Sequence, residues 1–173
     1  MEWKNNIIEK YPELFEKTGY KKIQFSCGEG WSWLIDNLCE KIAQHIEETS
    51  NPMKNFNKLM GLKNEDKKEE IKLKVTITTI KEKFGVLNVY CDGSDNTIWN
   101  YISFATHLSV SMCEKCGTTK HMGKTSGWIK NICYNCAQDD VNKKSWVSVD
   151  DIPIDKYKSK IRKEKILNIK NKL

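Results

Sequence analysis

The sequence predicts an α+β fold, and three of its features support the prediction. Apolar residues recur at helical spacing in two segments, and between these segments apolar and polar residues alternate as in a half-buried strand. Two Cys-x-x-Cys pairs follow the second helical segment. We therefore expect a small helix–hairpin–helix body at residues 1–112, a metal-binding ribbon at 113–138, and an extension at 139–173 that carries a basic C-terminal tail.

The first part of the body is expected to be helical. A short helix is predicted to begin near Tyr11, because Pro12 fits the first turn of a helix. The segment from Cys27 to Gly30 predicts a turn, since two glycines bracket one residue. The segment 31–48 predicts a longer helix with its apolar side chains on one face. These side chains are Leu34, Ile35, Leu38, Cys39, Ile42 and Ile46.

A hairpin and a second long helix are expected next. Alternating apolar residues predict a strand at 73–79, and a second β-prone run covers 86–91. Residues 81–85 are expected to join the two as a longer loop. Asp95 is a good N-cap for a helix that runs to about Ser111. Its expected buried stripe consists of Ile98, Tyr101, Ile102, Ala105, Leu108, Ser109 and Met112.

Four cysteines have the spacing of a zinc site. The two Cys-x-x-Cys pairs are Cys113 with Cys116 and Cys133 with Cys136, and 16 residues separate them. Zn²⁺ prefers four ligands in a tetrahedron, and a tight turn brings both sulfurs of a pair to one ion. Four thiolates leave no open position, so one structural zinc ion is predicted. Disulfides or unrelated cysteines are the weaker alternative, and His121 between the pairs is expected to be a solvated loop residue.

The formal net charge of +6 is carried by the tail. Residues 155–173 contain eight basic and two acidic residues, whereas the rest of the chain contains 21 of each. The sequence has no apolar run of the roughly 20 residues that a membrane-spanning helix needs, and residues 1–10 lack the apolar core of a signal peptide. We therefore expect a cytosolic protein with reduced cysteines. The polar stretch at 49–70 predicts a solvated loop.

Several short blocks of residues occur in a specific order. They are Tyr11-Pro12-Glu13-Leu14-Phe15, Cys27-Gly28-Glu29-Gly30-Trp31, Leu34-Ile35-Asp36-Asn37-Leu38-Cys39, Lys81-Glu82-Lys83-Phe84-Gly85 with Tyr90, the pair at Cys113 and Cys116, and Trp128-Ile129 before Cys133. Together they resemble a family of uncharacterised small bacterial and phage proteins. The resemblance covers most of residues 11–138, and the polar insert at 51–70 and the tail from 155 depart from it. It implies an accessory protein of phage or bacterial origin and supplies no activity.

Aromatic and basic side chains near two turns predict a binding site for a small anionic, nucleotide-like ligand. The candidate residues are Trp31, Trp33, Lys81, Lys83, Phe84 and Tyr90. Aromatic rings can stack on a base while lysines neutralise a phosphate. Gly28 and Gly30 could also present backbone N–H groups to an anion. For each residue taken singly, a place in the core or in a solvated loop is the commoner role. Given the phage-like resemblance, we hypothesise that the ligand is a signal of a host defence system.

The main alternative function is nucleic-acid binding through the ribbon and the basic tail. The ribbon carries Lys115, Lys120, Lys124 and Lys130, with Trp128 and Tyr134 available to stack on bases. A host protein is a third candidate partner, since aromatic side chains also suit protein interfaces. The sequence contains no nucleophile–base arrangement, phosphate loop or open metal site, so a non-catalytic protein is expected. The sequence does not predict an oligomeric state.

Overall fold

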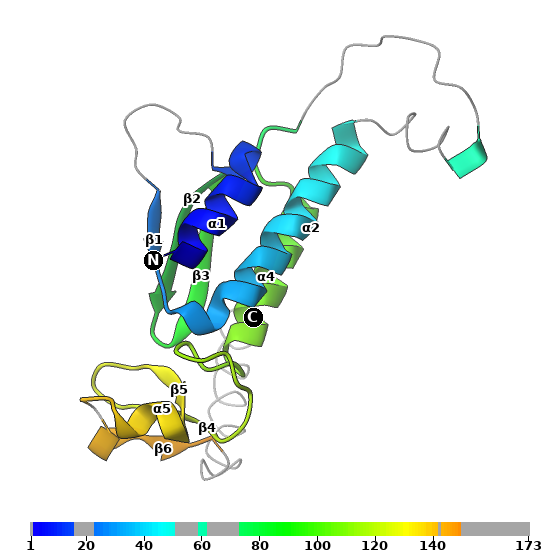
Figure 1. Ribbon diagram of the computed structural model, residues 1–173. Coiled ribbons are helices and arrows are strands. Elements are labelled where there is room, and N and C mark those ends of the chain that lie inside the picture. Colours follow the sequence, from blue (N-terminus) through cyan, green and yellow to red (C-terminus); the bar gives the residue numbers. More distant parts are fainter. Residues whose placement is uncertain (1, 16–22, 51–58, 62–72, 142, 150–173) are drawn as a thin grey trace, which may run out of the picture.

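The computed structural model describes residues 2–15, 23–50, 59–61, 73–141 and 143–149 (Figure 1). It confirms an α+β fold with two small sheets of three strands each. We call the described residues up to Met112 the body and those from Cys113 to Val149 the ribbon. In Figure 1 the body forms the upper part of the molecule, and the ribbon lies below it.

The sheet of the body has mixed pairing. β1 (Gln24–Ser26) runs parallel to β2 (Thr76–Lys83), and β2 is antiparallel to β3 (Val86–Asp92). The strand order is therefore β1-β2-β3, with β3 at an edge. The expected hairpin of β2 and β3 is present, whereas no sequence pattern indicated β1.

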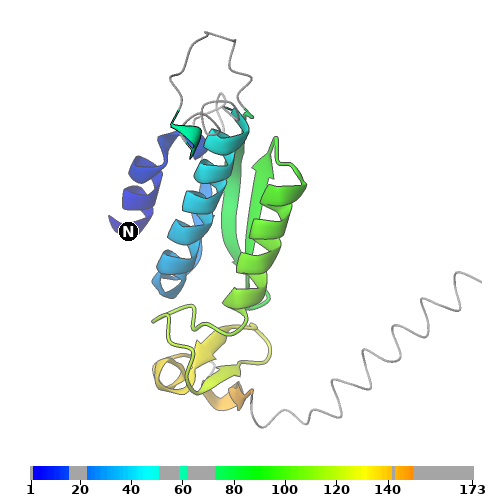
Figure 2. The same ribbon diagram turned by 90° about the vertical axis from the view of Figure 1, so that its right-hand side faces the viewer.

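Three helices lie on one face of this sheet. They are α1 (Glu2–Lys10), α2 (Ser32–Ser50) and α4 (Asn96–Ser109), and Figure 2 shows them side by side in front of the strands. No helix of the described residues covers the opposite face. Side chains of β2 and β3 that point to that face, such as Lys81 and Tyr90, therefore keep part of their surface exposed.

The core of the body lies between the helices and the sheet. The predicted apolar face of α2 is buried through Leu34, Ile35, Leu38, Cys39 and Ile42, and α4 buries Ile98, Ile102, Ala105 and Ser109. All of these residues except Ser109 form one hydrophobic cluster with Ile77, Ile80, Leu87 and Val89 of the sheet. Each fully buried aliphatic side chain contributes roughly 1.5–3 kcal/mol. Leu108 departs from the predicted stripe and is exposed, and α4 ends at Ser109 rather than near Ser111.

The N-terminal helix lies before Pro12, not after it. α1 ends at Lys10, and Pro12 instead opens a single 3-10 turn that runs to Leu14. A residue that precedes proline is disfavoured in the α conformation, so Tyr11 ends the helix. The apolar residues expected of a helix from Tyr11 are still buried, because the 3-10 turn directs Leu14 and Phe15 into the core.

The hairpin loop is shorter than the sequence suggested. β2 continues to Lys83, and only Phe84 and Gly85 lie between the strands. Both residues have positive φ, 56° and 74°, as in the two-residue turns that match the twist of a hairpin. Gly85 N–H donates to the carboxylate of Glu82 at 2.5 Å, which closes the turn. Phenylalanine is an unusual residue at positive φ, where an L-residue pays roughly 1–2 kcal/mol.

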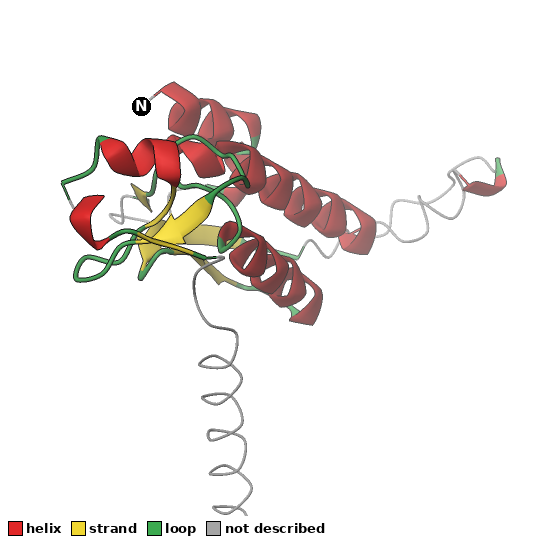
Figure 3. Ribbon diagram, turned by 90° about the horizontal axis from the view of Figure 1, so that it is seen from below, coloured by secondary structure: helices red, strands yellow, loops and turns green. Residues whose placement is uncertain are grey.

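The ribbon contains the second sheet, with strand order β5-β4-β6. Its strands are β4 (Met122–Lys124), β5 (Asn131–Cys133) and β6 (Val147–Ser148), with α5 (Tyr134–Gln138) directly after β5. Figure 3 views the molecule from this end, with the ribbon in front of the body helices.

The ribbon extends further than the predicted boundary at residue 138. β6 pairs with β4, and Val149 N–H donates to the carbonyl of Met122 at 2.9 Å. The indole of Trp146 lies against Gly123 and donates to the carbonyl of Ile132 at 3.0 Å. A glycine is needed at 123 because a Cβ atom there would overlap the indole ring. The ribbon therefore needs the segment up to residue 149 to complete its sheet and its small core.

Two predicted segments fall mainly outside the described residues. These are most of the polar stretch at 49–70 and the basic tail from residue 155. Within the described ranges, no helix has the length and the apolar character needed to cross a bilayer.

Candidate metal centre and ligand groove

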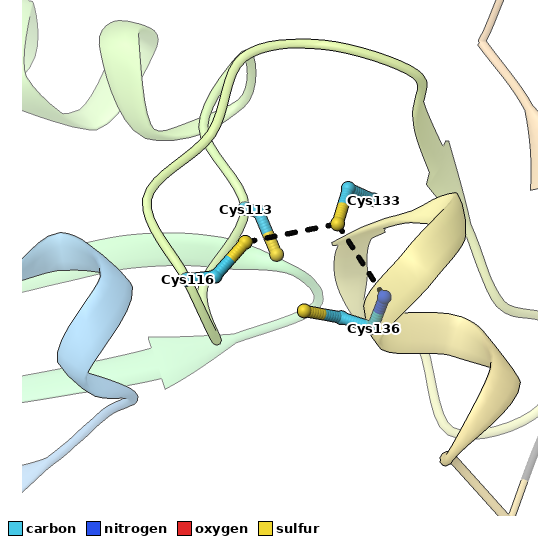
Figure 4. Close-up of side chains that lie close together, drawn as sticks. All are labelled: Cys113, Cys116, Cys133 and Cys136. Carbon is cyan, nitrogen blue, oxygen red and sulfur yellow. Dashed lines mark hydrogen bonds between the residues drawn. The ribbon is translucent and has the colours of Figure 1, made fainter.

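The sulfur atoms of Cys113, Cys116, Cys133 and Cys136 converge on one point, two from the loop after α4 and two from the start of α5 (Figure 4). All four lie within 4.8 Å of one another, and Sγ of Cys116 is 3.7 Å from Sγ of Cys133. Zn–S bonds of about 2.3 Å in a tetrahedron require sulfur–sulfur distances of about 3.8 Å. The cluster therefore fits one tetrahedral metal ion such as zinc, with a small contraction where the sulfurs lie farthest apart.

Local turns place each pair of sulfurs. In the first pair, Gly117 N–H donates to the carbonyl of Cys113 at 2.8 Å, and Gly117 has a φ of 75°, as its position after the pair predicts. In the second pair, Cys133 is the N-cap of α5, and its Sγ accepts from the N–H of Cys136 at 3.5 Å. Both arrangements direct the side chains of the cysteines toward one another.

Burial raises the pKa of Cys116 and of Cys136 within the cluster, whereas the pKa of Cys113 is lowered. Burial acts to raise the pKa of the Cys113 thiol, but backbone N–H groups, those of Cys133 and Cys116 foremost, donate to its sulfur and lower the pKa overall. The thiolate is the form that binds metal. Outside the cluster, burial raises the pKa of Cys27 and of Cys39 to about 12 each. Both of these side chains pack against the core of the body, as expected.

The first Cys-x-x-Cys turn is docked onto the body by the segment before α2. Gly28 N–H donates to the carboxylate of Glu114 at 2.9 Å, and Gly30 N–H donates to the Glu114 carbonyl at 2.8 Å. These N–H groups were candidates for binding an external anion. Their partner is instead a residue of the ribbon, so they are not available to a ligand. Burial raises the pKa of Glu114, although the Gly28 N–H acts in the opposite direction.

A buried asparagine fixes the other side of this junction. Nδ2 of Asn131 donates to the carbonyls of Ser109 at 2.9 Å and Val110 at 2.7 Å. These carbonyls lie at the C-terminus of α4, where the Ser109 carbonyl also accepts from the N–H of Met112 at 3.3 Å. The side chain of Asn131 has no exposed surface, and its bond to the Ser109 carbonyl is buried. The chain entering the ribbon is thus held by both α2 and α4.

The structure separates the six residues that the sequence grouped as a ligand site. Trp31 has no exposed surface, because its indole lies in the core of the body and donates to the Met112 carbonyl at 3.0 Å. Trp31 therefore cannot contact a ligand, which corrects the prediction for this residue. Trp33 is 63% exposed and lies in a depression beside Cys116, away from the sheet residues. Phe84 lies at the hairpin tip with the ammonium of Lys83 5.4 Å from its ring centroid.

Two of the predicted residues, Lys81 and Tyr90, remain together. Nζ of Lys81 is 5.4 Å from the centroid of the Tyr90 ring, a cation–π distance. They line a depression of about 410 Å³ together with Val89, Asp92, Ser94 and Trp99, among others. We call this depression the sheet groove. Trp99 of α4 is 61% exposed and was missed by sequence reasoning, although its place off the apolar stripe of the helix was a usable signal.

The sheet groove includes backbone groups of the edge strand β3. In a two-residue hairpin the residues that flank the turn are hydrogen-bonded to each other, and every second residue then points its N–H and C=O away from the partner strand. Leu87 is one such residue: its N–H donates to Oγ of Ser109 at 3.0 Å, and its carbonyl accepts from Thr106 at 3.1 Å. Val89 is the next one, so its N–H and C=O point along the edge, where the groove lies.

His45 and Asp95 form a contact between α2 and α4 that sequence reasoning did not predict. Nε2 of His45 is 2.7 Å from Oδ2 of Asp95, whose other oxygen accepts from Ile98 N–H at 2.9 Å and caps α4 as predicted. The hydrogen bond from His45, and then that from Ile98, lower the pKa of Asp95. The imidazole also meets the Tyr101 ring edge-on at 6.2 Å. The contact ties the start of α4 to α2.

Comparisons with protein family models, with curated proteins and with solved structures found no match. The resemblance to small bacterial and phage proteins therefore stays a prediction.

Proposed function

We propose that the protein captures a small anionic, nucleotide-like ligand in the sheet groove. The observation that supports this best is that Lys81 and Tyr90 line one depression with the exposed ring of Trp99. The volume of about 410 Å³ lies within the range of small-molecule sites. A cation next to two partly exposed rings is a combination that favours a flat base carrying a phosphate.

The chemistry of the groove favours one orientation of such a ligand. A phosphate would lie toward Lys81, because the carboxylate of Asp92 repels an anion at the other side of the groove. The hydroxyl groups of a sugar could donate to Asp92 and exchange hydrogen bonds with Ser94. The base would stack on Trp99 or Tyr90, within reach of the outward N–H and C=O of Val89. A donor and an acceptor on one residue suit the hydrogen-bonding edge of a base.

We propose capture rather than turnover, because burial raises the pKa of Cys91, the thiol that lines the groove, and a thiol with a raised pKa is a poor nucleophile. In a phage or bacterial accessory protein, capture of a signalling nucleotide would remove it from a host defence pathway. Such a role requires tight binding and no reaction.

We also infer that the four cysteines hold one zinc ion with a structural role. Soft thiolate ligands in a tetrahedral set favour zinc, and four protein ligands leave no position for a reactant. When bound, the ion would cross-link the loop after α4 to the start of α5. The cysteines themselves orient these two segments through the turns described above.

The proposal is tested by a thermal-shift screen of mononucleotides, dinucleotides and cyclic nucleotides. A ligand present at a hundredfold excess over its Kd adds about 2.7 kcal/mol to the free energy of unfolding. With the best ligand, Lys81→Gln should weaken binding roughly tenfold or more, because a charge-assisted hydrogen bond contributes about 1.5–3 kcal/mol. Trp99→Ala should weaken it as well, by removing a stacking surface.

Phe104→Ala is the matched control for Trp99→Ala, because Phe104 is also an exposed aromatic residue of α4 but does not line the sheet groove. It should leave the affinity unchanged. If no nucleotide raises the melting temperature, or if all three variants bind equally well, ligand capture in the sheet groove is wrong. Recovery of a host protein with the chain would then favour a protein interface.

A further inference from the structure

The tip of the β2–β3 hairpin has a residue that its turn does not favour. Phe84 has a φ of 56°, where glycine, asparagine and aspartate are the usual residues, and its side chain is 67% exposed. Phenylalanine is therefore unfavourable for this backbone conformation, and its ring does not contribute to the core. Strained residues that the fold itself does not require are often retained for contact with a partner. The ammonium of Lys83 lies 5.4 Å from the ring centroid, and the carboxylate of Glu82 is held in the same turn by the Gly85 N–H.

The hairpin tip lies against a loop of the ribbon. A Cβ atom on Gly85 would be 3.4 Å from Cγ2 of Ile129 and 3.2 Å from the backbone nitrogen of Asn131, so the two segments are in contact. Figures 1 and 2 both show the tip of this hairpin at the ribbon. Trp128, next to Ile129, is 70% exposed. The junction thus presents two large aromatic rings, Phe84 and Trp128, from different parts of the chain.

The ribbon side of this surface carries more positive than negative charge. The ribbon contains six lysines and three acidic residues in the sequence from 113 to 149. Two of these three acids already have partners, because Glu114 accepts from Gly28 and Asp140 is 2.6 Å from Lys130. Lys124 stands at the end of β4, where the Trp128 loop begins, and Lys83 stands beside Phe84. A partner that covers the aromatic rings would therefore meet cations at its edges.

We infer that this junction surface, made by Lys83, Phe84, Lys124 and Trp128, binds single-stranded nucleic acid. Exposed rings supply faces on which bases stack, and lysines neutralise the phosphates between them. A duplex fits less well, since its bases are already stacked and cannot reach Phe84 or Trp128. An acidic protein would match the lysines, but it would not need flat rings on two separate segments. The surface is distinct from the sheet groove, so either site can exist without the other.

Substitution of Phe84 by asparagine separates binding from folding. Asparagine tolerates positive φ, so Phe84→Asn should melt at the same temperature as the wild type or higher. The probe is a short fluorescein-labelled oligothymidylate, followed by anisotropy with the full-length chain. Phe84→Asn and Trp128→Ala should each weaken binding roughly five- to 150-fold, the range seen when one stacking side chain is removed. Phe104→Ala, an exposed aromatic on α4, should bind as the wild type does.

The salt dependence of oligonucleotide binding tests whether the lysines contact phosphates. For single strands, log K falls by about 0.7 per log unit of salt for each phosphate contact. Lys83→Gln and Lys124→Gln should each reduce this slope by about that amount, whereas Lys41→Gln on the exposed side of α2 removes the same charge and should leave the slope unchanged. Equal affinity of Phe84→Asn, Trp128→Ala and wild type would overturn the inference, as would tighter binding to a hairpin duplex than to the single strand. A lower melting temperature of Phe84→Asn would show that Phe84 supports the fold and would also overturn it.

Discussion

Replacement of Gly30 by alanine should destabilise the protein at the junction of body and ribbon. A Cβ atom at this position would lie 2.2 Å from the carbonyl oxygen of Cys113 and 2.5 Å from the backbone nitrogen of Gly117. Both are backbone atoms, so no side-chain rotation relieves the overlap. Overpacking costs about 1–3 kcal/mol, and separating the segments also weakens the hydrogen bond from Gly30 to Glu114, which contributes about 0.5–1.5 kcal/mol. We expect a loss of about 2–4 kcal/mol.

Urea denaturation followed by circular dichroism measures this loss, and thermal melting should show a decrease of roughly 4–16 °C. Gly127→Ala is the matched control, because Gly127 has a φ of 78° but no atom within 4 Å of the Cβ position. Its cost is conformational only, roughly 1–2 kcal/mol. The reasoning is wrong if Gly30→Ala is as stable as the wild type, or if it loses no more free energy of unfolding than Gly127→Ala does. Close approach of the two backbones would then not be the reason for a glycine at position 30.

Three further predictions concern the metal centre and the two helix ends. Purified protein should contain about one zinc per chain by elemental analysis, and Cys116→Ser should lose it while Cys91→Ser keeps it, because only Cys116 belongs to the cluster. Asn131→Ala should lower the free energy of unfolding by roughly 1–3 kcal/mol in urea titrations, since it removes the amide that donates to the carbonyls of Ser109 and Val110; an unchanged midpoint would contradict this. Because hydrogen bonds from His45 and Ile98 lower the pKa of Asp95, its carboxylate stabilises the fold above its ordinary pKa and loses that effect as the pH falls through the lowered value. Asp95→Asn should therefore be less stable than the wild type at neutral pH and equal to it in strong acid, and a pH-independent difference would refute the assigned cause.

Local patterns in the sequence were enough to predict the two long helices and the cysteine cluster. Apolar residues of α2 and α4 repeat at helical spacing, and burial of the resulting apolar face stabilises a helix whichever segments it packs against. The cysteine spacing predicts a cluster because each turn is closed by residues within the pair or next to it, as the bond from Gly117 to Cys113 shows. In both cases the information lies within a few residues of the feature itself.

Contacts between distant segments could not be predicted in this way. β1 has only three residues, and its parallel partner β2 begins about fifty positions later in the chain, so no local alternation indicates it. The same is true of the ligand residues. Lys81 and Tyr90 meet because they lie on facing strands, whereas Trp31 is buried by packing that its neighbours in sequence do not reveal. Trp99 joins the sheet groove only because α4 lies beside the edge strand.

The hairpin illustrates a third kind of difference. The sequence predicted a loop at residues 81–85 with glycine at its end, and phenylalanine at 84 is not a usual residue of a tighter turn. The structure nevertheless closes the turn with the Glu82 carboxylate, which accepts from Gly85 N–H. A side-chain acceptor three residues before a glycine is a signal that could have indicated the shorter loop.

The docking of Glu114 onto Gly28 and Gly30 has a consequence for how the chain unfolds. The segment that holds the first two cysteines and the segment that starts α2 cannot open independently, so the ribbon and the body should behave as one cooperative unit. Removal of the ion by a chelator should then accelerate hydrogen exchange not only in the ribbon but also at amides in the first turns of α2. A peptide that contains the ribbon alone should bind zinc more weakly than the whole chain does, since part of the binding free energy derives from contacts that only the body supplies.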